Sequence, residues 1–228
     1  MSLNKLAKFE ALKQMPNVYE NFSFHEPELT HKSEKITHKG NWKNGHFGNE
    51  NPLILELACG KGEYSVALGA KYPDKNFIGV DIKGNRIYTG AKLAQDQGLT
   101  NVAFIRTRIE LLHHFIAKNE IDEVWITFPD PFPSFSDRGN RLISPKFLNY
   151  YQRNFSDKKI TYHFKTDNFP LFRYASGVLD GRGEEVIQCL ENIYGIDKKI
   201  DDILRVETYY EQLHKSKGSQ IHYMQWKM

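Results

Sequence analysis

The sequence predicts an α/β fold in which a mostly parallel sheet of seven strands carries helices on both faces. From Pro52 onward, short apolar runs alternate with segments of helical periodicity, which is the pattern of a parallel sheet. Glycines follow the first apolar run, and carboxylates follow several of the others. Because ligands of such folds bind beyond the carboxyl ends of the strands, these residues are the first candidates for a functional site.

Each expected strand is a run of apolar, β-branched or aromatic residues bounded by polar or glycine-containing turns. The first of them, LILEL, is apolar except for Glu56 and reads as a buried strand. The seven expected strands cover residues 53–57, 76–82, 102–106, 124–128, 160–167, 185–190 and 221–226.

Each expected helix has apolar residues spaced three or four positions apart. Gly98 is suited to a helix C-terminus, and Ser144 followed by Pro145 indicates a helix start with a serine cap. The expected helices cover residues 63–73, 86–98, the segment from the third strand to about 118, 145–155 and 169–179.

The length of 228 residues suits one large domain. Residues 1–50 are polar and rich in His, so we expect a partly irregular N-terminal arm before a main domain at residues 51–228. No stretch approaches the ~20 apolar residues that cross a bilayer. The start lacks the apolar core of a secretion signal, so we expect a cytoplasmic protein without membrane contact.

Composition gives no indication of a metal site. Cys59 and Cys189 are the only cysteines, too few for a disulfide framework or a cysteine-rich metal site. His113 and His114 have no third ligand in view, so we expect no metal there. The net charge of +3 permits a polyanionic partner without requiring one.

The turn after the first strand favours a cofactor without phosphates. Gly60 and Gly62 let the backbone approach a ligand that a Cβ would exclude. A dinucleotide site would have a third glycine three residues after Gly62, where Ser65 stands. Glu63 also places a negative charge at the helix start, where it would repel a phosphate.

Two carboxylates accompany these glycines. Glu56 lies on the first strand, and Asp81 ends the second, where an acidic residue can accept both ribose hydroxyls of a nucleoside. The set Glu56, Gly60, Gly62 and Asp81 resembles the class I S-adenosylmethionine-dependent methyltransferase fold. This resemblance implies that Glu56 faces the cationic end of the cofactor. The alternative is that both carboxylates only cap helices. This alternative explains either carboxylate alone better than it explains the two together.

The stretch FPDPFP, Phe128 to Pro133, follows the fourth strand. Amino-methylating enzymes carry Asp/Asn-Pro-Pro-aromatic at this place, whereas here the aromatic Phe132 follows a single proline. Together with five further motifs, this stretch resembles the TrmB-type tRNA (guanine-N7-)-methyltransferases from about Gly40 to the C-terminus. The other motifs lie at 47–64, 77–87, 141–148, 163–168 and 208–218.

The resemblance implies a role for each matching residue. Asp130 is implied at the methyl-transfer centre, in contact with the cofactor or guanine, and Asp167 in guanine recognition; both are implied as catalytic. Thr208 and Glu211 are implied in substrate binding as part of a C-terminal lip. The partner is implied to be tRNA, with guanine-46 of the variable loop as its target. A further tRNA contact by the N-terminal arm is a hypothesis that rests on its Lys and His residues and not on the resemblance. Cofactor binding is expected of Glu56, Gly60, Gly62, Asp81, Glu110 and Asp130.

The reaction fits carboxylates without a catalytic His or Cys. Guanine N7 carries a lone pair and no proton, so its alkylation needs no general base, and in-line transfer depends on positioning and excluded water. Positive charge moves onto the purine, which a fixed carboxylate stabilises. A carboxylate also accepts hydrogen bonds from guanine N1–H and N2–H, which adenine cannot supply.

Two departures from the family lie at the cofactor end. Ala58 replaces the first glycine of the turn, and Arg108 replaces an acidic residue near the adenine. Glu110 is the candidate substitute, although a role at a helix start explains it equally well.

The third departure is the loop Ser134 to Asn140, where the family has several cations and this chain has only Arg138. Such a loss should weaken phosphate contacts. Compensation by other cations is a hypothesis, and among them Arg138 and Arg141 are our candidate substrate-binding residues. The cations considered are Arg138, Arg141, Arg153, Lys165 and those of the N-terminal arm.

Two other functions stay open at this point. One is a methyltransferase acting on another nucleic acid or a small molecule, and the other is a non-catalytic RNA-binding homologue. The oligomeric state, monomer or homodimer, is also open.

Overall fold

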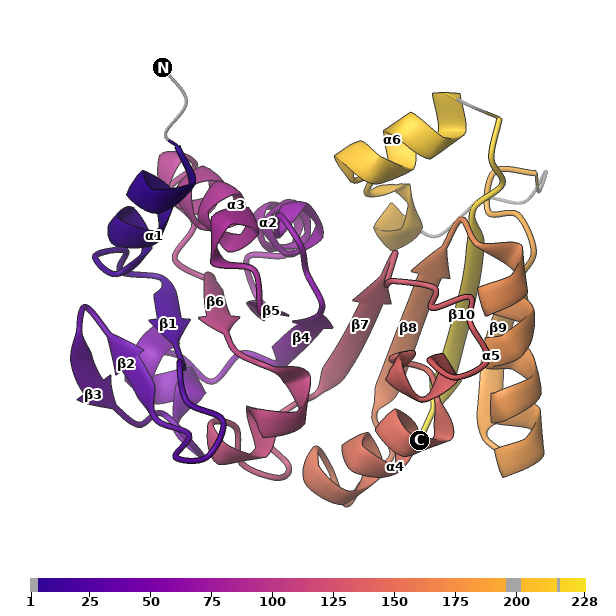
Figure 1. Ribbon diagram of the computed structural model, residues 1–228, viewed down its shortest axis with the longest axis horizontal. Coiled ribbons are helices and arrows are strands. Elements are labelled where there is room, and N and C mark those ends of the chain that lie inside the picture. Colours follow the sequence, from indigo (N-terminus) through magenta and orange to yellow (C-terminus); the bar gives the residue numbers. More distant parts are fainter. Residues whose placement is uncertain (1–3, 196–201, 217) are drawn as a thin grey trace.

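The computed structural model describes residues 4–195, 202–216 and 218–228, so Lys217 of the last motif lies outside the described residues. Within these residues, ten strands form one sheet (Figure 1). The strands are β1 Val18–Glu20, β2 Leu29–His31, β3 Glu34–Ile36, β4 Leu53–Leu57, β5 Asn76–Asp81, β6 Val102–Arg106, β7 Glu123–Thr127, β8 Thr161–Thr166, β9 Glu185–Leu190 and β10 His222–Lys227.

Helices cover both faces of the sheet, as expected (Figure 1). The expected strands and helices are present with shifts of a few residues at their ends, except that the segment after β6 forms only a short 3-10 helix. The helices are α1 Lys5–Leu12, α2 Glu63–Lys71, α3 Gly84–Asp96, α4 Pro145–Asn154, α5 Phe169–Arg182 and α6 Tyr209–Ser216; shorter turns are η1 Lys43–Phe47, η2 Ile109–His114, η3 Arg138–Asn140 and η4 Asp202–Arg205.

The strand order is β3-β2-β1-β6-β5-β4-β7-β8-β10-β9. In this order, the six strands from β1 to β8 (β1, β6, β5, β4, β7 and β8) are all parallel. Strand β10 lies between β8 and β9 and is antiparallel to both. From β4 the chain moves outward through β5 and β6, towards β1, and then crosses to β7 on the other side of β4. Such a reversal creates a crevice at the carboxyl ends of the two central strands, where ligands of this fold bind.

The N-terminal residues are more ordered than we expected, because they extend the sheet. Strand β1 pairs with β6 in parallel, with Val18 opposite Phe104 and Glu20 opposite Arg106. Tyr19 and Trp42 are buried, and the Trp42 indole donates to the carbonyl of Phe115. The strands here are three residues long, so their alternation is too short to be recognised in the sequence.

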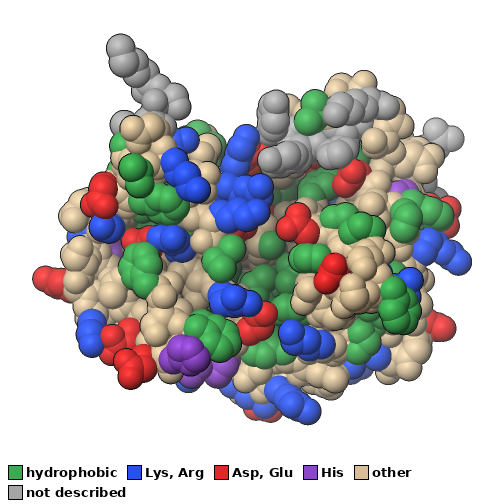
Figure 2. All heavy atoms as spheres, viewed as in Figure 1, with side chains coloured by type: hydrophobic (Ala, Val, Ile, Leu, Met, Phe, Trp, Pro, Cys, Tyr) green, Lys and Arg blue, Asp and Glu red, His purple; other side chains and the backbone are tan. Residues whose placement is uncertain are grey.

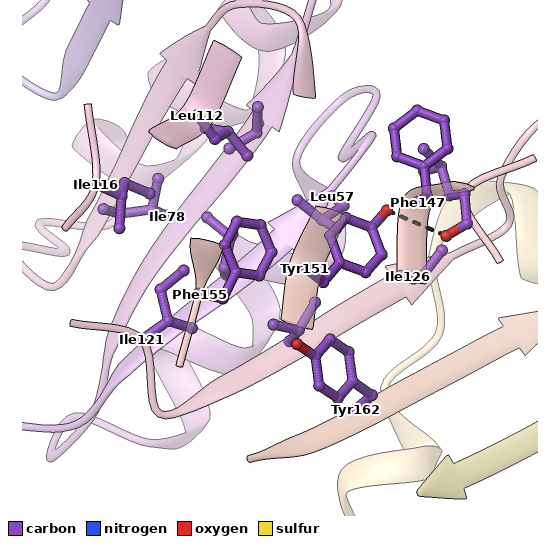
Figure 3. Close-up of a cluster of buried hydrophobic side chains, with 14 of the residues drawn as sticks. Leu57, Ile78, Leu112, Ile116, Ile121, Ile126, Phe147, Tyr151, Phe155 and Tyr162 are labelled. Carbon is purple, nitrogen blue, oxygen red and sulfur yellow. Dashed lines mark hydrogen bonds between the residues drawn. The ribbon is translucent and has the colours of Figure 1, made fainter. Parts of the chain in front are cut away.

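Two apolar cores, one on each face, hold the sheet. Figure 3 shows part of the larger core, in which residues of the central strands such as Leu57 and Ile126 face Tyr151 and Phe155 of the α4 region. The second core packs α2, α3 and α1 against the opposite side chains of β4 to β7, including Ile54. Burial of alternate residues in two different cores fixes the register of β4, and with it the position of Glu56.

No helix in the described part of the chain has both the length and the apolarity needed to cross a membrane.

Candidate active site

The turn from β4 into α2 bends sharply through three residues of positive φ. Ala58 has φ 56°, Gly60 57° and Gly62 67°. A Cβ on Gly62 would lie 2.3 Å from the Phe104 ring, so this glycine is required for packing of the turn on the sheet. A Cβ on Gly60 would meet no protein atom within 4 Å and would enter the open space above the turn. That space is therefore available to a ligand.

Glu56 is buried beneath this turn, with 4% of its surface exposed. One carboxylate oxygen accepts from the backbone N–H and hydroxyl of Ser65, and the other accepts from Thr127 at 2.7 Å. Burial nevertheless raises the pKa of Glu56 to about 7. A cationic group placed nearby would favour its ionised form, so Glu56 suits a positively charged ligand.

Asp81 connects the ends of β4 and β5. Its carboxylate accepts from the N–H of Gly60 at 2.9 Å and from the N–H of Lys83 at 2.7 Å. The first contact fixes the glycine turn relative to the second strand. Asp81 also lines a cavity beyond the ends of β5 and β6, so it connects the glycine turn with a space that a ligand can fill.

Asp130 lies exposed on a turn that is held in an unusual backbone conformation. Phe128 and Phe132 on either side have φ of 47° and 42°, a region that residues with side chains rarely occupy. The Phe128 N–H donates to the carbonyl of Lys165 at 2.8 Å, which fixes the start of the turn on β8. The neighbouring prolines remove further freedom, so Asp130 is held in a defined place.

Arg141 holds the other end of this turn. Its Nε donates to the carbonyl of Pro131 at 2.9 Å, and its Nη2 donates to that of Phe132 at 2.9 Å. The guanidinium lies 4.4 Å from the ring centroid of Tyr174, and only 7% of the residue is exposed. Arg141, which we expected to bind substrate, is thus placed under the turn rather than on the surface.

Two cavities meet at Asp130. The first, of about 280 Å³, lies beyond β5 and β6, and the second, of about 330 Å³, lies beyond β4, β7 and β8. Figure 2 shows the hollow in the middle of this face, with apolar side chains inside it and Lys or Arg along its rim. Both cavities are lined by Ala58, Arg86, Phe128, Pro129 and Asp130.

The structure brings most of the expected site residues to these cavities. Asp81 and Glu110 line the first, and Glu110 also lies in the first turn of η2, 3.8 Å from the Arg108 guanidinium. The second is lined by Glu56, Gly60, Asp167 and Thr208. Gly62, Glu211, Arg138 and Arg141 line neither cavity.

Arg86 and Lys83 were missed by the sequence analysis. Arg86 lies on α3 and lines both cavities, and Lys83 lines the first. The motif carrying the resemblance at 77–87 contains both residues. However, only the fold shows that the start of α3 lies at the cavities, so that both side chains form part of the cavity walls.

Glu211 forms a buried ion pair with Lys165, and both side chains have an exposed fraction of 0%. Lys165 also donates to the carbonyls of Leu204 and Val206, each at 3.1 Å, and Tyr194 donates to Glu211 at 2.7 Å. Burial lowers the pKa of Lys165, and Glu211 opposes that shift. These contacts anchor the segment that carries Thr208. The hypothesis that Lys165 grips tRNA is therefore wrong, because its ammonium is enclosed by protein.

Among the described residues, no group of three or more His, Cys, Asp or Glu side chains is placed to hold a metal.

The residues present fit S-adenosylmethionine. The open space over Gly60 admits a ligand backbone, and Glu56 and Asp81 offer carboxylates for a cationic group and for ribose hydroxyls. The sheet order and the glycine turn define the class I methyltransferase fold, whose cofactor is S-adenosylmethionine. A family model described as a putative methyltransferase matches residues 50–224.

Curated relatives give the particular family. The chain is 40% identical over its full length to a tRNA (guanine-N(7)-)-methyltransferase of Christiangramia forsetii, 99% of which is covered. It is also 40% identical over its full length to the enzyme of the same name from Bacteroides thetaiotaomicron, with 87% of that protein covered. The chain belongs to the tRNA (guanine-N(7)-)-methyltransferase family, as its motifs predicted.

Solved structures with low sequence identity share the fold. The 16S rRNA methyltransferase KamB superposes with a TM-score of 0.62 at 11% identity, over 86% of this chain and 96% of that one. A SAM-dependent methyltransferase from Aquifex aeolicus gives a TM-score of 0.52 at 13% identity, over 79% and 85%. These likenesses confirm the predicted fold class.

Proposed function

We propose that this enzyme transfers the methyl group of S-adenosylmethionine to N7 of guanine in tRNA, at guanine-46 of the variable loop. The relatives with this activity in their names, which match the whole chain, support the substrate. The observation that carries the proposal is the position of Asp130, on a fixed turn where the two cavities meet. A reaction between two bound molecules needs such a junction.

The two cavities would bind different parts of the cofactor and the substrate. The first, with Asp81, Glu110 and apolar walls, would hold the adenosine part of the cofactor, and Glu56 beside the second would face its cationic end. When bound, S-adenosylmethionine supplies an electrophilic methyl group on a sulfonium. The rest of the second cavity, including Asp167, is then left for guanine.

Asp130 and Asp167 would act by charge and hydrogen bonding. Guanine N7 loses no proton during methylation, so neither carboxylate has to act as a general base. As positive charge develops on the purine, a fixed carboxylate stabilises it. Asp167 would accept from guanine N1–H and N2–H, which discriminates against adenine. Thr208 forms part of the wall of the second cavity, and the buried pair of Lys165 and Glu211 holds the segment that carries it.

Arg141 and Glu211 then serve the substrate indirectly. Arg141 holds the turn that carries Asp130, and Glu211 holds the segment that carries Thr208. Exposed cations remain for tRNA, among them Arg138, Arg153 and, in the N-terminal arm, Lys32, Lys35 and Lys39. We also propose that the enzyme works in the cytoplasm, where tRNA is modified, as a monomer or homodimer.

Incubation with labelled cofactor and an unmodified tRNA transcript, followed by nucleoside analysis, tests the proposal. We expect N7-methylguanosine at position 46, and none in a transcript with 7-deazaguanine there. A folded enzyme that binds cofactor but yields no N7-methylguanosine would instead indicate another substrate, and one that binds no cofactor would indicate a non-catalytic homologue.

A further inference from the structure

The loop Ser134 to Asn140 presents an exposed aromatic ring paired with a cation. Phe135 is 79% exposed, more than any other large hydrophobic side chain among the described residues. The Arg138 guanidinium lies over this ring, 4.5 Å from its centroid. A single exposed apolar residue is common on protein surfaces. What distinguishes Phe135 is the guanidinium over its ring, a second group on which a base can stack.

Hydrogen bonds within the loop give it a defined shape. The hydroxyls of Ser134 and Ser136 bond to each other at 2.8 Å, and the N–H of Asn140 donates to the carbonyl of Asp137 at 2.8 Å. The Ser144 hydroxyl donates to the carbonyl of Gly139 at 3.1 Å and ties the loop to the start of α4. The Phe135–Arg138 pair is therefore carried on a structured turn.

The pair also lies close to the active site. Phe135 follows Pro131 by four residues, and Pro131 lines the second cavity, the one left for guanine. Four residues of extended chain span at most about 14 Å. Asn140, at the other end of the loop, lines the first cavity, which meets the second at Asp130. A base next to a bound target nucleotide would be within reach of the Phe135 ring.

We propose that Phe135 and Arg138 form a stacking platform for an unpaired base of the RNA substrate, next to the target guanine. Aromatic rings and guanidinium planes are the groups on which unpaired bases stack, and Arg138 adds a charge that attracts phosphate. The loop Ser134 to Asn140 has a single cation, so stacking would supply affinity for RNA that this loop cannot supply by charge. This inference rests on the proposed RNA substrate.

The distinguishing property of a stacking contact is its response to salt. Loss of a phosphate contact lowers the slope of log affinity against log salt by about one, whereas loss of a stacked ring leaves the slope unchanged. Stacking on one aromatic residue typically accounts for a ~5- to 100-fold change in affinity. The two side chains of the platform can thus be told apart.

The test measures binding of an unmodified tRNA transcript to the full-length enzyme at several salt concentrations. We expect Phe135→Ala to weaken binding ~5- to 100-fold with an unchanged salt slope, and Phe135→Trp to restore it. Arg138→Gln should weaken binding and lower the slope. Ile187→Ala, an exposed apolar truncation on the edge strand β9, is the control and should bind as wild type. Cofactor affinity should be the same for all variants.

Wild-type tRNA affinity in Phe135→Ala, or a Phe135→Trp variant as weak as Phe135→Ala, would overturn the platform. If these results come with N7-methylation by the wild-type enzyme, only the platform fails. If the wild-type enzyme neither binds nor methylates tRNA, the proposed function fails with it.

Discussion

The turn Phe128 to Pro133 and the loop Ser134 to Asn140 are consecutive in the chain but differ in how they are held. The turn is fixed by the Lys165 carbonyl at one end and by the buried Arg141 guanidinium at the other. The loop is exposed throughout and bonds mainly to itself. The difference suggests that a methyl-transfer centre needs buried support, whereas an RNA contact can change its chemistry without disturbing the fold.

The largest expected effect concerns the buried support. Lys165→Met leaves the Glu211 carboxylate buried without its cationic partner, so we expect the free energy of unfolding to fall by about 3–5 kcal/mol. Denaturant unfolding measures this loss. The control is Lys92→Met, which removes the exposed Lys92–Asp96 pair on α3 and should leave the midpoint close to that of wild type. Equal effects of the two variants would show that the buried pair does not support the site.

Substitutions of Arg141 distinguish a role in holding the turn from a direct contact with tRNA. If it holds the turn, Arg141→Lys and Arg141→Gln should both lower kcat about 10- to 100-fold, because a lysine cannot reproduce the two bonds and misplacement by 1 Å has effects of this size. The KM for tRNA and the salt slope should stay near wild type. Rescue by lysine, together with a lower salt slope for glutamine, would instead make Arg141 a phosphate contact.

The pKa of Glu56 gives the cofactor site a pH dependence that the exposed loop should lack. With a pKa of about 7 in the free enzyme, Glu56 is ionised above pH 7 and takes up a proton below it. Cofactor affinity should therefore fall about 10-fold from pH 8 to pH 6. Calorimetry with Glu56→Gln should show weaker binding without this dependence, and an unchanged pH profile in that variant would exclude Glu56 as its source.

The smallest expected effect lies at Ala58, in the turn between β4 and α2. At φ 56° a side chain is strained, and glycine would relieve that strain at a cost in unfolded-state entropy, so Ala58→Gly should raise stability by about 0.5–1 kcal/mol. Ala70→Gly, at an exposed position of helix α2, should lower it by a similar amount. Destabilisation by Ala58→Gly would contradict the strain.

The sequence predicted the parallel sheet and the positions of Glu56, Asp81, Asp130 and Asp167, because strand ends define where a ligand binds. It did not show that Lys165 and Glu211 pair in the interior, since residues 46 positions apart are brought together only by tertiary packing. The sequence also could not show that Arg141 supports the turn. That role follows from its burial, and the sequence alone does not indicate whether an arginine is buried or exposed. The three short N-terminal strands were missed because each has only three residues.

The most direct test of the division between turn and loop is the single-turnover rate of methyl transfer at saturating tRNA and cofactor. Asp130→Ala should remain about 100- to 1000-fold slower than wild type, because it removes the carboxylate that we propose stabilises the charge of the transition state. Phe135→Ala should reach the wild-type rate once tRNA saturates, because it removes only binding. Recovery of Asp130→Ala at saturation, or a slow Phe135→Ala, would contradict this division.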